Sequence, residues 1–409
     1  MKILSIETSC DETSLSLFTA TETASGTDFD VHSTITQSQI DIHQEFGGVF
    51  PAMGRREHQK NLVPILLKIL DQEPVLDSTP GTHPEIQEIL AREAELTEAF
   101  MKYVLPVKNP GIDAICVTSG PGLEPALWVG ISFAKALGVL WNIPVVPVNH
   151  MEGHILSVLV PESTSQDNNS FSVQSELFPF PALALLISGG HTEIVLVKNV
   201  GDYEIIGRTR DDAIGEAFDK VARILGLPYP GGPEVSKIAL KYDTTSEKHL
   251  VLPRPMIHSK DYDFSFSGLK TAVLYFVKEQ TKNTDLKISN AFADKGYNPD
   301  MLSDELKAEL AYEFQEAATE VITKKTLSAM NDFGVQTLIV GGGVSANKRI
   351  KESLMETISE IIPSDNIHFP TRELTGDNAL MIGLAGYFKI KNNPNAVYTD
   401  IRAEGNLRL

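Results

Sequence analysis

Apolar and polar positions along the chain form two kinds of pattern, short β-branched runs and longer runs with helical spacing. Residues 182–197 contain two apolar runs on either side of Ser188-Gly189-Gly190, which predicts two strands joined by a tight turn. Glycines have no Cβ, so the backbone N–H groups of such a turn can approach an anion closely. The turn is therefore a candidate phosphate contact, with an ordinary glycine hairpin as the alternative.

The N-terminal residues repeat this pattern. A buried strand is expected at 3–8 and a return strand at 14–18, with a polar turn between them. Asp11 and Glu12 stand in the turn. This arrangement resembles the hairpin with acids at its tip by which actin-like ATPases hold phosphate and its metal. A plain hairpin with solvated acids is the alternative.

A strand–helix–strand unit leads to the first candidate metal ligands. Strands are expected at 112–118 and 144–148, with a helix at 125–141 between them. His150 and His154 follow at once and are spaced i, i+4, which places both on one helix face where they can chelate one metal. Neutral imidazoles suit zinc or iron. Surface histidines are the alternative if no third ligand exists.

The third candidate ligand is Asp377, which opens the closing helix of the chain. A carboxylate is favoured there by the helix dipole, so a capping role alone is the alternative. Glu152 does not match a zinc protease, in which the glutamate directly follows the first histidine. It lies two residues after His150, roughly 200° around the helix, and is expected to point away from a metal.

Two further glycine-rich segments predict nucleotide contacts. Residues 226–233 precede a helix, and 341–343 follow an apolar strand and precede a helix at 346–359. Free N–H groups at such helix starts can bind a ribose or phosphate. Asp219 can bond sugar hydroxyls or form a helix salt bridge, and Asn347 is a candidate for reading a nucleoside. Together with the N-terminal hairpin, these segments predict a cleft between duplicated halves.

Composition narrows the partners and the domain count. The chain has 409 residues, 35 Lys and Arg against 54 Asp and Glu, and a net charge of −19. This length fits two or three domains, and this charge argues against a whole-surface grip on nucleic acid. A local patch of Arg55, Arg56, His58 and Lys60 is the candidate contact for RNA phosphates, with a solvated helix face as the alternative. The two cysteines indicate no disulfide framework, and no apolar run approaches the ~18 residues of a membrane span.

Three polar stretches look like insertions. Residues 71–110 are acidic and are expected to form an insertion rather than core, and 161–178 are expected to form a flexible surface loop. Residues 281–302 are polar and are expected to be another insertion. Between the last two, residues 263–273 place a serine near a helix start, which is a typical N-cap pattern.

Seven motifs occur in an order that resembles the TsaD/Kae1/Qri7 family of tRNA threonylcarbamoyladenosine transferases. They are MKILSIETSCDET, NHMEGH, LLISGGHTE, DDAIGEAFDKVARILGLPYPGGP, DFSFSGLKTAV, IVGGGVSAN and TGDNALMI. The resemblance covers nearly the whole chain apart from the three insertions. It implies an α/β fold of the actin/Hsp70/sugar-kinase type, with two duplicated ribonuclease-H-like lobes around a nucleotide cleft. The N-terminal lobe is expected at 1–178 plus 376–409, and the C-terminal lobe at 179–375.

The resemblance also implies a reaction and its residues. Threonylcarbamoyl is transferred from threonylcarbamoyl-adenylate to the adenosine 3′ of the anticodon in ANN-decoding tRNAs, and AMP is released. One divalent metal, zinc or iron, is implied at His150, His154 and Asp377, and Asp11 or Glu12 is implied on the reacting side as general base. The implied adenylate contacts are Leu186, Ile187, Ser188, Gly189, Gly190, Asp219, Gly232, Ser236 and Asn347.

Placement within the family rests on the insertions and on resemblance. The insertions and the resemblance favour the mitochondrial Qri7 branch, with a cytoplasmic location as the alternative. Membership of that branch implies a homodimer that works without accessory subunits. Three other functions are weighed against the transferase. A sugar-kinase-like ATPase would hold magnesium rather than two histidines, a metalloprotease is opposed by the position of Glu152, and a nucleotide-sensing scaffold would leave the chemistry to partners.

Overall fold

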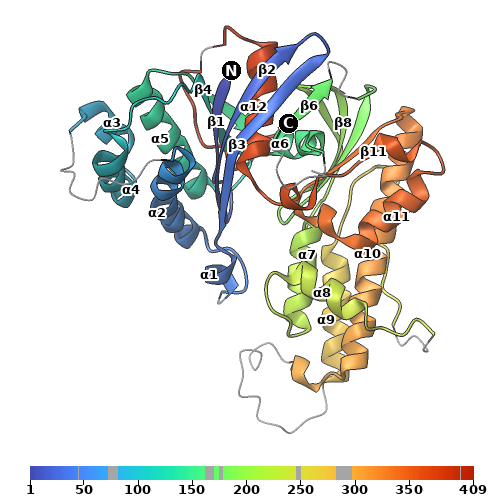
Figure 1. Cartoon of the computed structure of the whole chain (residues 1–409). Coiled ribbons are helices and arrows are strands. Elements are labelled where there is room, and N and C mark those ends of the chain that lie inside the picture. The colour runs from blue at the N-terminus through green and yellow to red at the C-terminus, as the bar shows by residue number, and fades with distance from the viewer. Residues whose placement is uncertain are drawn as a thin grey trace. The chain divides into compact units, whose positions relative to one another are not determined.

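The computed structural model describes two compact units of the chain. The described residues are 1–44, 46–71, 82–161, 170–174, 178–245, 250–281, 297–396 and 398–409. Unit 1 comprises 1–42, 49–177 and 370–409, and unit 2 comprises 43–48 and 178–369. Figure 1 shows the elements of both units. Most of the predicted surface loop at 161–178 and of the predicted insertion at 281–302, and the start of the stretch at 71–110, lie outside the described residues. The loop prediction is wrong for Ser170–Gln174, which form a strand.

Unit 1 is built on a mixed sheet whose described strands have the order β5-β4-β1-β2-β3-β6. β1 pairs antiparallel with β2 and parallel with β4, and β4 pairs parallel with β5. The carboxyl ends of β1, β4 and β5 therefore lie at one edge of the sheet. The bounds are β1 Lys2–Glu7, β2 Glu12–Thr23, β3 Gly26–Ser38, β4 Ala114–Gly120, β5 Val145–Asn149 and β6 Ser170–Gln174.

Unit 2 contains a second sheet, with the described order β11-β10-β7-β8-β9. β7, β8 and β9 form an antiparallel meander, while β10 runs parallel to both β7 and β11. The bounds are β7 Ala182–Ile187, β8 Thr192–Asn199, β9 Asp202–Arg208, β10 Leu338–Gly341 and β11 Ile367–His368.

The two sheets have the same topology. In each, a three-stranded meander is extended by two parallel strands beside its first strand, so that β1 to β5 correspond in order to β7 to β11. The helices between the third and fourth strands, and after the fourth, also fall at equivalent places. The predicted two-lobed α/β fold with duplicated halves is confirmed.

Helices cover both faces of the unit 1 sheet. On one face, α2 and α5 contact the strands and one another. On the other, α12 packs so closely that a Cβ on its Gly386 would lie 2.2 Å from Sγ of Cys116. This contact explains the buried cysteine as a packing residue. The bounds are α1 Ile40–Gln44, at the boundary of the units, α2 Pro51–Ile69, α5 Glu124–Trp141, α6 His150–Leu156 and α12 Ala379–Asn392.

The prediction that 71–110 lies outside the core is wrong for residues 84–104. Here α3 (Pro84–Ile89), α4 (Ala94–Ala99) and a π-helical turn (Phe100–Val104) pack on α5 and α2. The phenyl ring of Phe100 meets that of Phe133 edge-on at 5.8 Å. Many of its apolar side chains belong to the hydrophobic core of unit 1. Those with 3% exposure or less are Ile86, Leu90, Leu96, Phe100, Met101 and Val104.

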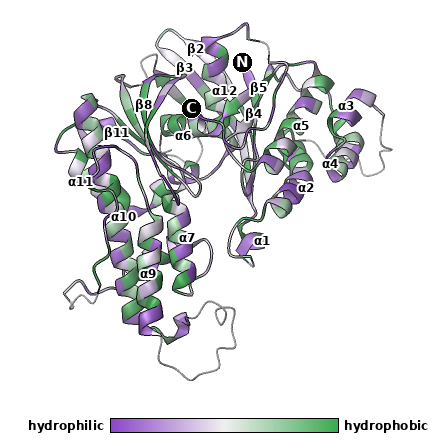
Figure 2. Ribbon diagram, turned by 180° about the vertical axis from the view of Figure 1, so that it is seen from behind, coloured by the Kyte–Doolittle hydropathy of each residue, from purple (hydrophilic) through white to green (hydrophobic). Residues whose placement is uncertain are grey.

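Unit 2 has its core between the sheet and a group of helices around α10. α10 packs on α8, α9 and α11, and Figure 2 shows hydrophobic and hydrophilic residues along α9 and α10, as expected of helices with one buried side. The bounds are α7 Ile214–Ile224, α8 Gly231–Ala239, α9 Ser267–Gln280, α10 Asp304–Phe333 and α11 Lys348–Ile358. In the described part of the chain, no helix is both long and apolar enough to cross a bilayer.

The start of α9 is capped by a residue from another segment. The expected serine N-cap is wrong, because Phe266 holds the N-cap position and makes no side-chain cap bond. The carboxylate of Asp211 instead accepts the N–H groups of Phe266 and Ser267 at 2.8 and 3.1 Å. It also accepts the hydroxyls of Ser265 and Ser267 at 2.5 and 2.7 Å.

Candidate metal centre and glycine-lined strand ends

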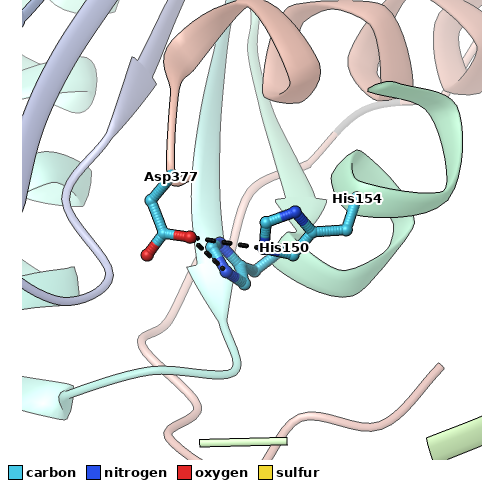
Figure 3. Close-up of side chains that lie close together, drawn as sticks. All are labelled: His150, His154 and Asp377. Atoms are coloured by element: carbon cyan, nitrogen blue, oxygen red, sulfur yellow. Dashed lines mark ion pairs between the residues drawn. The ribbon is translucent and has the colours of Figure 1, made fainter. Parts of the chain in front are cut away.

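Three side chains of unit 1 form a candidate metal centre. His150 begins α6 directly after β5, and one helical turn later His154 lies beside it, with ring centroids 4.7 Å apart. Oδ1 of Asp377 lies 3.3 Å from Nε2 of each histidine, as Figure 3 shows. One ligand atom from each residue lies within 4.8 Å of the others. The structure thus brings together the three predicted ligands from distant parts of the sequence.

Asp377 is not needed as the cap of α12. The N-cap residue is Asn378, whose Oδ1 accepts the N–H of Met381 at 3.0 Å. Asp377 stands one residue earlier and directs its carboxylate to the histidines. The capping alternative for Asp377 is therefore wrong.

The charges around the centre fit a cation. Burial lowers the pKa of His150, but the carboxylates of Asp377 and Glu7 outweigh it and hold that pKa well above its ordinary value. Burial favours the protonated form of Asp377, yet His150 keeps the pKa of Asp377 below its usual range. Burial lowers the pKa of His154, and neither of its ring nitrogens has a hydrogen-bond partner among the described residues. Two imidazoles and a carboxylate match the donor set of zinc or iron.

Glu152 is not part of the cluster of candidate metal ligands. It is 8% exposed, and its charge acts on Lys389 and Tyr398. Burial lowers the pKa of Lys389, and the Glu152 carboxylate opposes that shift. The arrangement therefore lacks the glutamate that a zinc protease of the H-E-x-x-H type requires.

The predicted acids of the N-terminal turn lie near the centre. Asp11 is 8% exposed and ends the turn between β1 and β2, and Glu12 begins β2. Burial raises the pKa of Glu12 well above its ordinary value, and the nearby charges of Asp377 and Asp11 raise it further. Burial and the same acids raise the pKa of Cys10. The turn thus places a carboxyl group with raised proton affinity within electrostatic reach of Asp377.

Sequence analysis missed one residue of this centre, Glu7. It ends β1 with a fully buried side chain, and its Oε2 lies 3.1 Å from Nδ1 of His150. A charged residue at the end of an otherwise apolar strand was the available signal. β5 lies two strands from β1 in the sheet and brings His150 to Glu7. The order of these strands cannot be predicted from the local sequence pattern.

The predicted basic patch on α2 is largely neutralised by acids of unit 1. His58 is fully buried, and its Nδ1 lies 2.8 Å from the Thr13 hydroxyl, so the prediction of an RNA contact is wrong for His58. The other three cations each have an acidic partner: Arg55 with Glu93, Arg56 with Glu95 and Lys60 with Glu57.

In unit 2, glycine-bearing loops meet at the carboxyl ends of β7 and β10. These strands are parallel neighbours, with Leu186 opposite Gly341. A Cβ on Gly342 would lie 2.4 Å from the carbonyl oxygen of Ile187, and one on Gly215 would lie 2.6 Å from that of Ser188. The backbone segments therefore touch in a way that only glycine permits. Carboxyl ends of neighbouring parallel strands are where α/β proteins bind ligands.

Other glycines at this edge leave open space. A Cβ on Gly189, Gly190 or Gly343 would have no heavy atom within 4 Å. The turn itself is closed by bonds between Ser188 and His191, because the Ser188 N–H donates to the His191 carbonyl at 2.9 Å. The side chain of Leu186, like that of Ile187, is fully buried, which leaves the main chain of this strand end for contact with a ligand.

The remaining predicted nucleotide residues form hydrogen bonds that link three helices. Oδ1 of Asp219 on α7 accepts the N–H of Gly231 at 2.7 Å, at the start of α8. Ser236 on α8 donates to the carbonyl of Gly232 at 3.0 Å and accepts from Nδ2 of Asn347 at 3.1 Å. Oδ1 of Asn347 also caps α11. These side chains hold the helix starts in place around the glycine loops.

The chain is thus a two-lobed α/β protein with duplicated halves, with a His-His-Asp cluster in one half and glycine-lined strand ends in the other. The family model "TsaD: tRNA N6-adenosine threonylcarbamoyltransferase" matches residues 78–384. A tRNA N6-adenosine threonylcarbamoyltransferase of Burkholderia vietnamiensis is 39% identical over 400 residues, covering 98% of this chain and 95% of the relative. One of Chromobacterium violaceum is 38% identical over 391 residues, covering 96% and 94%. The chain belongs to the TsaD family of tRNA N6-adenosine threonylcarbamoyltransferases.

Solved structures with similar folds are more distant. Full-length HypF, in a phosphate- and nucleotide-bound form, is 11% identical with a TM-score of 0.49, covering 97% of this chain and 47% of that one. Component A of the (R)-2-hydroxyglutaryl-CoA dehydratase of Acidaminococcus fermentans is 11% identical with a TM-score of 0.43, covering 96% and 99%.

Proposed function

We propose that this chain transfers threonylcarbamoyl from threonylcarbamoyl-adenylate to the adenosine 3′ of the anticodon in ANN-decoding tRNAs. The exocyclic amine of the adenosine forms a bond to the carbamoyl carbon. The bond from that carbon to the phosphate oxygen breaks, AMP leaves with the electron pair, and the amine gives up a proton. The observation that carries this proposal is the cluster of His150, His154 and Asp377 in a chain of this family.

The cluster is proposed to hold one divalent metal, zinc or iron. Both ring nitrogens of the buried His154 lack a hydrogen-bond partner among the described residues, and Asp377 aims its carboxylate at both rings rather than at a helix end. A bound metal ion would supply Lewis-acid polarisation and orientation of the threonylcarbamoyl group. The protein supplies two neutral nitrogen ligands and one anionic oxygen ligand for it.

The glycine-lined strand ends of unit 2 are proposed to bind the adenylate. N–H groups at Gly189 and Gly190 can donate to the phosphate, since no Cβ blocks the approach and no heavy atom would lie within 4 Å of one. Donors fixed in advance cost little reorganisation when charge develops on the leaving AMP. Asp219 holds the start of α8 by accepting the N–H of Gly231, and Asn347 joins the start of α11 to α8 by donating to Ser236.

Glu12 is proposed as the proton acceptor, with Asp11 as the alternative. An effective general base has a pKa near the working pH. Burial, Asp377 and Asp11 together raise the pKa of Glu12, in the direction that brings a carboxylate towards neutrality. Replacing Glu12 by Gln should lower kcat more than replacing Asp11 by Asn does. The opposite ranking would assign the role to Asp11.

Incubation with tRNA and threonylcarbamoyl-adenylate, followed by mass spectrometry of the nucleosides, tests the function. The wild-type chain should produce threonylcarbamoyladenosine and AMP in equal amounts. His150→Ala should abolish the product while circular dichroism shows an intact fold. Asp400→Asn is the matched control, because Asp400 is an exposed acid in the same unit, paired only locally with Arg402. Undiminished product from His150→Ala would refute the metal assignment, and no product from wild type would refute the function.

We also propose, from the resemblance to the Qri7 branch, that the chain works as a homodimer in the mitochondrion without accessory subunits. Threonylcarbamoyl-adenylate and tRNA would then be its only substrates. Light scattering of the purified chain should give twice the monomer mass, and the chain alone should modify tRNA. A monomer that is active only with an added subunit would contradict this placement, as would a cytoplasmic location of the tagged protein.

A further inference from the structure

A buried carboxylate stands behind one of the two candidate histidine ligands. Glu7 ends β1 with 0% exposure, and the proposed reaction gives it no task so far. A carboxylate is costly to bury unless several donors satisfy it. Its partners therefore indicate what it does.

Glu7 accepts hydrogen bonds from three directions. Its Oε1 accepts the backbone N–H of Ser9 in a short bond. Its Oε2 accepts the hydroxyl of Thr118 on β4 at 2.5 Å and lies 3.1 Å from Nδ1 of His150. The Ser9 hydroxyl also lies 3.3 Å from that Nδ1. These residues come from the carboxyl ends of the three neighbouring strands β1, β4 and β5.

The donor and acceptor roles at Nδ1 follow from the chemistry of the groups. An ionised carboxylate only accepts hydrogen bonds, so the contact to Glu7 requires a proton on Nδ1 of His150. In the neutral ring, the lone pair then lies on Nε2. Nε2 is the atom that faces Asp377, at 3.3 Å. The buried carboxylate thus selects the tautomer in which His150 can bind a metal.

We propose that Glu7 is a positioning residue for the metal centre, a proposal that rests on the proposed metal binding by His150, His154 and Asp377. Glu7 fixes the ring orientation and the tautomer of His150 and increases the basicity of Nε2 as a ligand. Carboxylates that accept from the second nitrogen of a ligating histidine typically contribute 10- to 100-fold to metal affinity. Thr118 and the Ser9 amide hold Glu7 in turn.

The two histidine ligands are therefore not equivalent. His154 is also fully buried, yet its Nδ1 has no hydrogen-bond partner among the described residues. Among the described residues, His150 is the one candidate histidine ligand whose Nδ1 contacts a carboxylate. Loss of Glu7 should consequently act through His150 alone.

Glu7→Gln is the sharpest variant, since it keeps size and removes only the charge and one acceptor. If the new amide nitrogen replaces Oε2, it donates towards Nδ1 of His150, which must then accept and carry its proton on Nε2. If it replaces Oε1, it faces the N–H of Ser9, donor against donor. The first arrangement removes the free lone pair on Nε2 of His150. The second replaces a hydrogen bond to Ser9 by two donors that face each other.

Zinc affinity, measured by competition with a chromophoric chelator, tests the proposal. Wild type is compared with Glu7→Gln and with the control Glu93→Gln, which changes another buried glutamate of unit 1, one that pairs with Arg55 on α2. Glu7→Gln should bind zinc about 10- to 100-fold more weakly, and Glu93→Gln should match wild type. Thermal unfolding without zinc shows whether each variant is folded. Equal zinc affinity of folded Glu7→Gln and wild type would overturn the role of Glu7.

A second measurement needs no variant of Glu7. Nitrogen-15 NMR of histidine-labelled, zinc-loaded wild type, with His150 assigned through His150→Gln, should show Nδ1 protonated and Nε2 bound to zinc. Coordination through Nδ1 would overturn the proposal even if Glu7→Gln failed to fold. Absence of zinc and iron binding to wild type would instead refute the proposed metal site on which this role rests.

Discussion

Two adjacent glycines after β10 offer a paired test of the proposed nucleotide loops. Gly342 has a φ of +90°, and a Cβ there would lie 2.4 Å from the carbonyl oxygen of Ile187. Gly343 has no heavy atom within 4 Å of a built Cβ. Alanine at the first position meets backbone, while alanine at the second meets open space. The two variants share the same chemistry and differ in their surroundings.

The expected destabilisation follows from these two contacts. Gly342 has a ψ of 160°, a backbone region that is essentially restricted to glycine, so an alanine there costs about 1–3 kcal/mol. An overlap that the backbone must relieve costs about 1–3 kcal/mol more. Gly342→Ala should therefore lower the free energy of unfolding by about 2–6 kcal/mol. Gly343→Ala should leave it unchanged or raise it by up to about 1 kcal/mol, because alanine restricts the unfolded chain.

Urea unfolding and AMP binding by calorimetry distinguish structure from ligand contact. If the strand end binds the adenylate, Gly343→Ala should weaken AMP binding without loss of stability, since its methyl group occupies the open space. Gly342→Ala should weaken both. Equal stability of the two variants would refute the close contact with Ile187, and normal AMP binding by Gly343→Ala would remove that glycine from the proposed site.

Three further predictions concern unit 1. Phe100→Ala should cost about 3–5 kcal/mol in urea unfolding, because the ring is fully buried; a loss below about 1 kcal/mol would return 84–104 to the status of an insertion. Zinc at 100 times its Kd should stabilise the unit by about 2.7 kcal/mol, or about 5–10 °C in Tm by calorimetry. Asp377→Asn should abolish this shift, and the control Asp400→Asn should keep it. A full shift in Asp377→Asn would contradict the proposed set of three ligands. Zinc affinity should rise with pH by up to about tenfold per unit below the raised pKa of His150, because burial lowers that pKa but Asp377 and Glu7 outweigh it and zinc must displace the proton. A zinc affinity that does not change between about pH 6 and 8 would contradict the raised pKa of His150.

Local patterns predicted the elements and ligands that depend on short sequence distances. The hairpin around Ser188 and the i, i+4 pair of His150 and His154 each lie within one short segment, so period and spacing were sufficient. Asp377 was predicted as a ligand because a metal held by His150 and His154 needs a third ligand, and a carboxylate is favoured at the start of a helix. The structure adds that Asn378 takes the capping role and leaves Asp377 to the histidines.

What the sequence did not predict depends on contacts between distant segments. Asp211 caps α9 from more than fifty residues away, so no local capping pattern could reveal it. Residues 84–104 lie in an acidic stretch, and only the position of α5 and α2 shows that many of their apolar side chains belong to the core. Glu7 belongs to an apolar strand, and its meaning depends on the side-by-side order of β1, β4 and β5.

The duplicated topology shows how one arrangement of strands can serve two kinds of chemistry. At the ends of β1 and β4, unit 1 places side chains, and the carboxylate of Glu7 and the hydroxyl of Thr118 meet beside His150. At the equivalent ends of β7 and β10, unit 2 places glycines, so that backbone groups meet instead. A buried carboxylate can accept the N–H of a ligating imidazole and leave the other ring nitrogen free for a metal, which a backbone N–H cannot do because it only donates. Bare backbone can approach a phosphate, which a strand end occupied by carboxylates would repel. The two sheets are thus alike in topology and differ in the chemical groups at their strand ends.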